Sequence, residues 1–168
     1  MNAAIWLGAV VFFTVGAAPV CVSPAAEKLL GTANFPFYSG AFAQIVLTRC
    51  FLFLGTSAVI ALLHLLAEWL YMGRPTRKFS LVLVGGLLTL VLLGGSLIGP
   101  RLESLHYRHH APNAPPAERA AAASAYRLWH AGLQVLNALM IAGLVVYVWR
   151  VANPSDAPRF ISSVKFRG

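Results

Sequence analysis

The amino-acid sequence predicts an all-α integral membrane protein, a four-helix bundle, on three observations. First, 58% of the 168 residues are hydrophobic and only 11% are charged, whereas charged residues make up about a quarter of a typical soluble domain. Second, the apolar residues gather in four stretches, each long enough to cross a hydrocarbon layer about 30 Å thick. Third, the connections between these stretches are short, which leaves no room for a separate catalytic domain.

The first two spans are expected at about 3–20 and 38–71. Pro19 marks the end of the first span. The connection after it carries Glu27 and Lys28 in an amphipathic stretch, which we expect to lie along the membrane surface. The second stretch holds about 34 residues, so at 1.5 Å per residue it exceeds the hydrocarbon thickness by about two thirds. We therefore expect it to tilt, bend or protrude.

The last two spans are expected at about 79–99 and 117–150. The third span contains no charged residue and ends before Pro100. Two prolines stand before the fourth span, and an alanine-rich run leads into its apolar part. This pattern predicts one long helix with the prolines at its start. The sequence thus predicts a four-span transmembrane domain over residues 1–151 and a flexible cytoplasmic tail over residues 152–168.

The formal net charge of +8 fits membrane lipids as partners better than nucleic acid, because the basic residues lie mostly at the ends of apolar stretches. Arg74, Arg77 and Lys78 follow the second span, and further basic residues lie in the tail. With four spans these groups fall on one side of the membrane, which the distribution of basic residues marks as cytoplasmic. We expect both termini in the cytoplasm and the chain in the inner (plasma) membrane of a bacterium.

The glycines of the third span and the two cysteines each allow two interpretations. Gly95 and Gly99 lie one helical turn apart, a spacing that lets helices approach closely. They serve either packing inside one bundle or self-association and contact with other membrane proteins. Cys21 and Cys50 are too few for a disulfide framework. They are either two unpaired thiols or one disulfide.

Six polar residues are expected to share the outer half of the membrane, where an unpaired ionisable group costs a few kcal/mol. They are Arg49, Arg101, Glu103, His130, Gln134 and Asn137. One interpretation is an arginine–glutamate ion pair with hydrogen bonds that hold the helices together; the other is a functional site. His130, Gln134 and Asn137 are spaced i, i+4 and i+7, so they lie on one helix face. That face either lines a polar cavity or bonds to neighbouring helices.

Histidines raise the possibility of a cofactor. His64 and Glu68 can meet at i, i+4, as a hydrogen-bonded pair, a proton relay or a ligand oriented by an acid. His64 and His130 lie near opposite ends of their spans, on the order of 20 Å apart, so one haem iron cannot bind both. Haem, a pigment or copper held by His64 or His130 alone remains as an alternative to no cofactor.

The expected external loop contains three imidazoles, His106, His109 and His110. Imidazole suits copper, zinc and nickel, so the loop is either a weak metal site or a surface that contacts headgroups. We find no nucleotide-binding loop, nucleophile elbow or zinc-protease helix motif in the sequence. This favours a protein without catalytic residues.

The order of several short motifs resembles the transmembrane protein 205-like family of small four-span membrane proteins. The motifs are Trp6-Leu7-Gly8 with Phe12 and Phe13 before Ala18-Pro19, then Phe35-Pro36-Phe37-Tyr38, Arg101-Leu102-Glu103, and Tyr126-Arg127-Leu128-Trp129-His130 before Asn137. The resemblance implies a helical membrane protein without an established biochemical activity, in a family whose eukaryotic members are linked to drug resistance and vesicle trafficking. The residues it singles out are Arg101, Glu103, His130 and Asn137. A more distant similarity is to copper resistance protein D, whose early spans carry histidines that the first span here lacks.

Three functional hypotheses follow. The first is a non-enzymatic membrane protein of the transmembrane protein 205-like type, with a role in transport, tolerance or membrane-complex assembly. The second is a haem-, pigment- or copper-binding subunit of a larger membrane complex. The third is a membrane enzyme that uses Arg101, Glu103 and His130 as acid and base, for which the sequence suggests no reaction.

Overall fold

The chain folds as an all-α bundle, as the sequence predicts. The computed structural model describes residues 2–72 and 78–153, and this part of the chain is helical and contains no strand. The elements are α1 (Asn2–Phe12), η1 (Phe13–Ala17), α2 (Ala18–Cys21), α3 (Pro24–Leu30), α4 (Phe35–Met72), α5 (Lys78–Leu92), η2 (Leu93–Ile98), α6 (Gly99–His109) and α7 (Pro116–Ala152). The elements η1 and η2 are π-helical segments.

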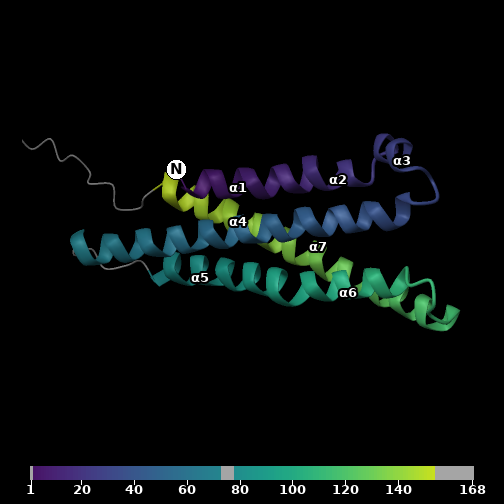
Figure 1. The fold of residues 1–168 in the computed structure, drawn as a ribbon. Coiled ribbons are helices and arrows are strands. Elements are labelled where there is room, and N and C mark those ends of the chain that lie inside the picture. The colour runs from purple at the N-terminus through teal and green to yellow at the C-terminus, as the bar shows by residue number, and fades with distance from the viewer. Residues whose placement is uncertain (1, 73–77, 154–168) are drawn as a thin grey trace, which may run out of the picture.

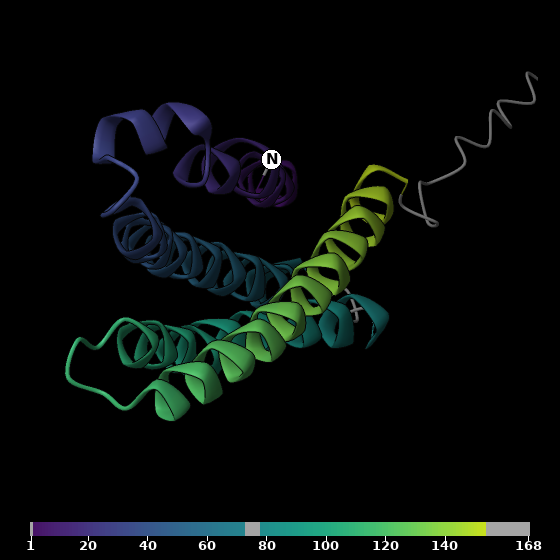
Figure 2. The ribbon, with the colours of Figure 1, turned by 90° about the vertical axis from the view of Figure 1, so that its right-hand side faces the viewer.

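Four helical rods run up, down, up and down, and successive rods are neighbours (Figures 1 and 2). The continuous rods are α1–η1–α2, α4, α5–η2–α6 and α7, and each is long and apolar enough to cross a membrane. The α1 rod contacts α4 and α7, and the α5 rod also contacts both. This ring of four antiparallel neighbours is the simplest four-helix bundle topology. The chain is therefore an integral membrane bundle.

Helix α4 is much longer than a bilayer requires. Its 38 residues span about 57 Å, against a hydrocarbon layer of about 30 Å. The Asn2 side-chain amide donates a hydrogen bond to the Ser57 carbonyl at 2.9 Å, which places the start of α1 beside Ser57. The rest of α4 extends beyond that point, as Figure 1 shows. Excess length is thus accommodated by protrusion past α1.

Each π-helical segment ends two residues before a proline. Pro19 lies two residues after η1 and Pro100 two residues after η2. A proline inside a helix has no N–H to donate, and its ring clashes with the carbonyl four residues earlier. A wider π turn moves that carbonyl away, and the amides of Ala18 and Gly99 donate instead to carbonyls five residues back. The helix therefore continues through each proline.

This continuation corrects one expectation. We expected the third helix to close at Gly99 and residues 106–110 to form a loop, but α6 runs on to His109. The expected loop is limited to the segment between His110 and Pro115. Arg74, Arg77 and tail residues 154–168 lie outside the described residues. Arg150 lies with its guanidinium 4.6 Å from the Phe79 ring, so the start of α5 and the end of α7 share one end of the bundle.

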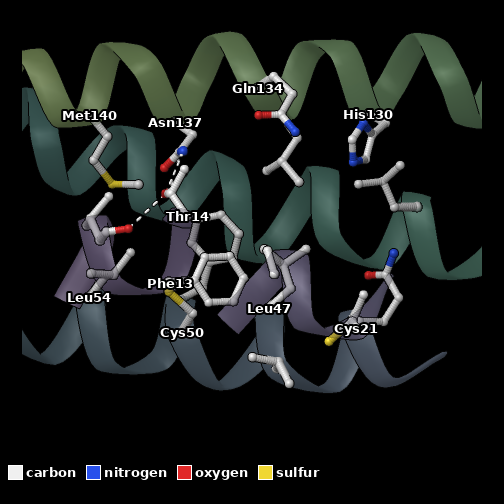
Figure 3. A pocket seen from close by; sticks show the side chains of 18 of the residues that line it. Phe13, Thr14, Cys21, Leu47, Cys50, Leu54, His130, Gln134, Asn137 and Met140 are labelled. Carbon is white, nitrogen blue, oxygen red and sulfur yellow. Dashed lines mark hydrogen bonds between the residues drawn. The ribbon is translucent and has the colours of Figure 1, made fainter. Parts of the chain in front are cut away.

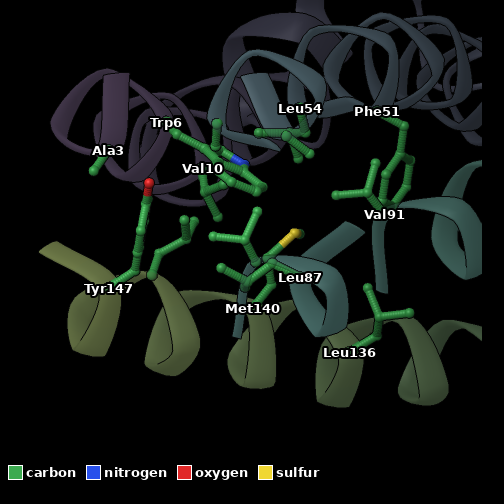
Figure 4. Packing of buried hydrophobic residues seen from close by; sticks show 14 of the residues in the cluster. Ala3, Trp6, Val10, Phe51, Leu54, Leu87, Val91, Leu136, Met140 and Tyr147 are labelled. Carbon is green, nitrogen blue, oxygen red and sulfur yellow. The ribbon is translucent and has the colours of Figure 1, made fainter. Parts of the chain in front are cut away.

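A continuous apolar core fills the half of the bundle that contains the start of α1 (Figure 4). Trp6, Leu54, Leu87 and Leu144 are almost completely buried in it. In α4, three residues before Leu54, the Phe51 ring packs directly on Gly94. A Cβ atom added at Gly95 would lie 3.1 Å from the Phe51 Cβ. These glycines therefore pack inside the bundle. Self-association through Gly95 and Gly99 stays a prediction.

Candidate functional site

A partly open cavity of about 150 Å³ lies between the helical rods, toward the end that carries α3, and its mainly apolar wall includes several polar side chains (Figure 3). Side chains from the α1–η1–α2 rod, from α4 and from α7 form most of its wall. The polar members of that wall are Thr14, Cys21, Gln44, Cys50, Tyr126, His130, Gln134 and Asn137. None of the residues that line it is Asp, Glu, Lys or Arg. The wall therefore combines a mainly apolar surface with several hydrogen-bonding groups.

The stripe of α7 predicted from its spacing lines one wall of this cavity. His130, Gln134 and Asn137 all line it (Figure 3). The Asn137 amide donates to the Thr14 hydroxyl oxygen at 3.0 Å, and that hydroxyl donates to the Val10 carbonyl at 2.8 Å. Both predicted alternatives thus occur together, because one residue bonds across to η1 while the stripe as a whole faces the cavity.

The two cysteines also line the cavity, and both are free thiols. Cys21 donates to the carbonyl of Ala17 at 3.6 Å, one turn back in its own helix. Cys50 faces the cavity from α4 (Figure 3). Of the two alternatives left by the sequence, the structure contains unpaired thiols.

The charged members of the predicted cluster lie elsewhere. Arg49, Arg101 and Glu103 are exposed, and none of them lines the cavity. Glu103 borders a separate hollow of about 70 Å³ between α4 and α6. Neither arginine forms an ion pair with Glu103 within the described residues. Arg101 lies two positions from Glu103 on the same helix, so their side chains point in different directions. The six-residue cluster therefore divides into three α7 residues that line the cavity and three charged residues that lie outside it.

His106 has a structural environment that the sequence did not reveal. Its side chain is 5% exposed, and its ring stacks on Phe37 with 5.6 Å between centroids. Nε2 lies 2.9 Å from the Phe37 carbonyl oxygen. A carbonyl only accepts, so Nε2 carries the proton. The ring also lies directly over Gly40, where a side chain would be only 2.7 Å from Nδ1. His106 therefore locks α6 onto α4.

The other two imidazoles of the predicted metal site are also engaged. His110 Nδ1 lies 3.0 Å from the His106 carbonyl, and His109 Nδ1 lies 3.2 Å from the Arg119 carbonyl. The His110 ring is 4.5 Å from each of the other two ring centroids. Within the described residues, no three His, Cys, Asp or Glu side chains are grouped so that they could hold a metal ion. The metal site stays a prediction, with one ring nitrogen of each imidazole free of these bonds: Nδ1 of His106 and Nε2 of His109 and His110.

A family model described as a domain of unknown function, DUF4149, matches residues 1–111, which is more than half of the chain. The chain belongs to the DUF4149 family. No curated protein and no solved structure matches it. The DUF4149 match contains the cavity residues Thr14, Cys21, Gln44 and Cys50, whereas the polar stripe of α7 lies beyond it.

His64 lies apart from the cavity of this DUF4149 protein. Its Nε2 is 3.5 Å from the Glu68 carboxylate, and its side chain is 72% exposed on the outer surface of α4. Leu54 is the last α4 residue that lines the cavity, ten positions or about 15 Å before His64. A group bound at His130 would therefore be separate from a group bound at His64.

Sequence reasoning missed Thr14, Gln44 and Tyr126 as cavity residues. Thr14 had a usable signal, because it is the one hydroxyl within an otherwise apolar first span. Gln44 had a similar signal, an amide deep within the second stretch. Nothing in the sequence indicated that these residues and α7 face one another, since their separations along the chain reach 123 residues.

Proposed function

We propose that this DUF4149 protein is a non-enzymatic integral membrane protein of the transmembrane protein 205-like type, which serves transport or tolerance by binding a small molecule inside the bundle. The observation that carries this proposal is the cavity between the rods, whose wall includes polar side chains. Thr14 and Asn137 bond to each other, but Gln134 makes no side-chain hydrogen bond within the described chain, and an unpaired polar group in a membrane costs free energy. A ligand explains its position.

The lining of the cavity supports a binding role over an enzymatic one. General acid–base catalysis needs a positioned pair of titratable groups. His130 shares the cavity wall with Tyr126, Cys21 and Cys50, but its ring forms no hydrogen bond to any of them within the described residues. Arg101 and Glu103, which the enzyme hypothesis needs beside His130, are exposed outside it.

The alternative is a haem-, pigment- or copper-binding subunit, and one observation favours it. The exposed His64, with Glu68 beside it, is placed to bind a group at the outer surface of the bundle. The internal cavity suits this alternative poorly, because pockets for cofactor-sized molecules have about 300–1,000 Å³. A visible absorption spectrum and metal analysis of the purified protein test it. A Soret or pigment band, or near-stoichiometric copper, would replace the proposed function.

A cavity-filling variant tests the proposed function in cells. Cells without the gene are challenged with a panel of membrane-permeant biocides, and complemented with the wild-type chain, Ala43→Phe or Val135→Phe. Ala43 lines the cavity, whereas Val135 is exposed on the outer surface of α7. We expect the wild-type chain and Val135→Phe to restore the growth phenotype, and Ala43→Phe to fail. Equal complementation by all three chains would refute a role for the cavity.

The proposal includes the orientation. Both termini are placed in the cytoplasm of a bacterial inner membrane, which agrees with the shared end of the bundle that carries Lys78 and Arg150. The cavity then opens nearer to the outer side, at the end that carries α3.

A further inference from the structure

The size of the cavity sets a narrow range of ligands. An engineered apolar cavity of about 150 Å³ is known to bind benzene and stays free of water when empty. The cavity here has the same volume, about 150 Å³, so one aromatic ring fills it, and it is partly open where His130 and Gln134 are exposed.

The charge of the lining sets the second limit. No residue that lines the cavity is Asp, Glu, Lys or Arg, and an unpaired charge in a membrane interior costs several kcal/mol. A carboxylate or ammonium ligand would find no counter-charge there. The ligand is therefore neutral.

The hydrogen bonds already made inside the cavity set the third limit. One of the two Asn137 Nδ2–H groups donates to Thr14, and the Thr14 hydroxyl proton is donated to the Val10 carbonyl. Asn137 Oδ1 remains as an acceptor and its second N–H as a donor. Gln134, one turn away on the same face, is exposed and makes no side-chain hydrogen bond to the described part of the chain, so its amide can donate and accept. A hydroxyl group, which both donates and accepts, complements this pair.

The opposite wall is apolar. Phe13, Leu47 and Leu54 face the stripe of α7 from η1 and α4 (Figure 3). A ligand with an apolar body and one polar end therefore lies with its body against these side chains and its polar end toward Gln134 and Asn137.

We infer that the cavity binds neutral, single-ring molecules that carry one hydroxyl group, with phenol as the simplest member. This inference rests on the proposed function and specifies its ligand class. Gln134 and Asn137 are the specificity-determining residues, and the apolar wall supplies most of the affinity. One net hydrogen bond of about 1 ± 0.5 kcal/mol predicts that phenol binds about 2- to 10-fold tighter than benzene.

Calorimetric titration of the full, detergent-purified chain with phenol, anisole, benzene and benzoate tests the inference. We expect phenol to bind most tightly, anisole and benzene more weakly, and benzoate not at all. Gln134→Leu should remove the preference for phenol over benzene while benzene binding persists, which shows that the variant is folded. Thr56→Val, an exposed hydroxyl outside the cavity, should behave as the wild-type chain.

The outcomes distinguish a failure of the ligand class from a failure of the proposed function. Ala43→Phe should bind none of the four compounds, and binding to it equal to the wild type would mean that the signal arises in the micelle, which overturns the inference. Equal affinities for phenol and benzene in the wild type, or benzoate binding, would overturn the ligand class alone. The proposed function fails separately, through the complementation of cells by the Ala43→Phe chain.

Discussion

The contact between Gly40 and His106 makes a sharp test of how α6 is held against α4. A methyl group at Gly40 would overlap the His106 ring and lie 2.7 Å from Nδ1 and 2.9 Å from Nε2. The ring cannot simply swing away, because it is buried, stacked on Phe37 and hydrogen-bonded to the Phe37 carbonyl. Gly40→Ala should therefore expel the ring from its site.

The magnitude follows from the groups involved. Overpacking in a filled core costs about 1–3 kcal/mol, and the lost hydrogen bond adds about 1 kcal/mol. Alanine in place of glycine within a helix gains back up to about 1 kcal/mol. Gly132→Ala is the matched control, because this helical glycine has no neighbouring atom within 4 Å of the added carbon. The two variants should differ by about 2–4 kcal/mol in the free energy of unfolding.

Unfolding in mixed micelles by SDS titration, followed by tryptophan fluorescence, measures this difference. A double-mutant cycle sharpens it, since Gly40→Ala should cost much less when His106→Ala has already removed the ring. The reasoning is wrong if Gly40→Ala is as stable as Gly132→Ala. It is also wrong if the two changes at positions 40 and 106 are additive.

Three further predictions concern packing, topology and the outer surface. Phe51→Ala should cost about 3–5 kcal/mol by the same unfolding assay, because the ring fills the space over Gly94, whereas Leu52→Ala at an exposed position should cost much less. In a chain whose native cysteines are replaced by alanine, Asn113→Cys should react with an impermeant thiol reagent from outside and Ser163→Cys should not; the opposite result would reverse the orientation. His64→Ala should change stability by less than about 1 kcal/mol, because the pair with Glu68 is exposed, and a large loss would indicate a partner at this surface.

The length and number of the helices could be predicted from the sequence, because a membrane permits few alternatives to a continuous apolar helix. The end of the third helix could not. Pro100 usually marks a helix end, but a π turn absorbs its missing hydrogen bond, and the helix continues to His109. The rule that proline ends a helix fails here. Helix α6 packs against both α4 and α7, so continuing the helix through a π turn preserves contacts that a helix end at Pro100 would lose.

The candidate site was predictable only in the part that lies on one helix. The i, i+4, i+7 spacing of His130, Gln134 and Asn137 fixes a common face, and that face does line the cavity. The partners opposite it, such as Thr14 and Cys50, come from other helices, and no local pattern relates them to α7. The depth argument placed Arg101 and Glu103 at the same level, but depth says nothing about which way a side chain points.

The neighbours Gln134 and Asn137 allow binding and structural roles to be separated on one helix face. Asn137→Leu removes the bond to Thr14 and should cost about 0.6–1.7 kcal/mol, as interhelical hydrogen bonds in membranes do. Gln134→Leu removes no bond within the described chain, replaces an amide by an apolar side chain, and should leave stability unchanged or raise it by up to about 1 kcal/mol. Opposite signs in the unfolding assay would mean that Gln134 is retained at a cost to stability, as residues that bind ligands often are. An equal loss for both variants would instead make Gln134 part of the helix packing, and the polar wall would then need no ligand to explain it.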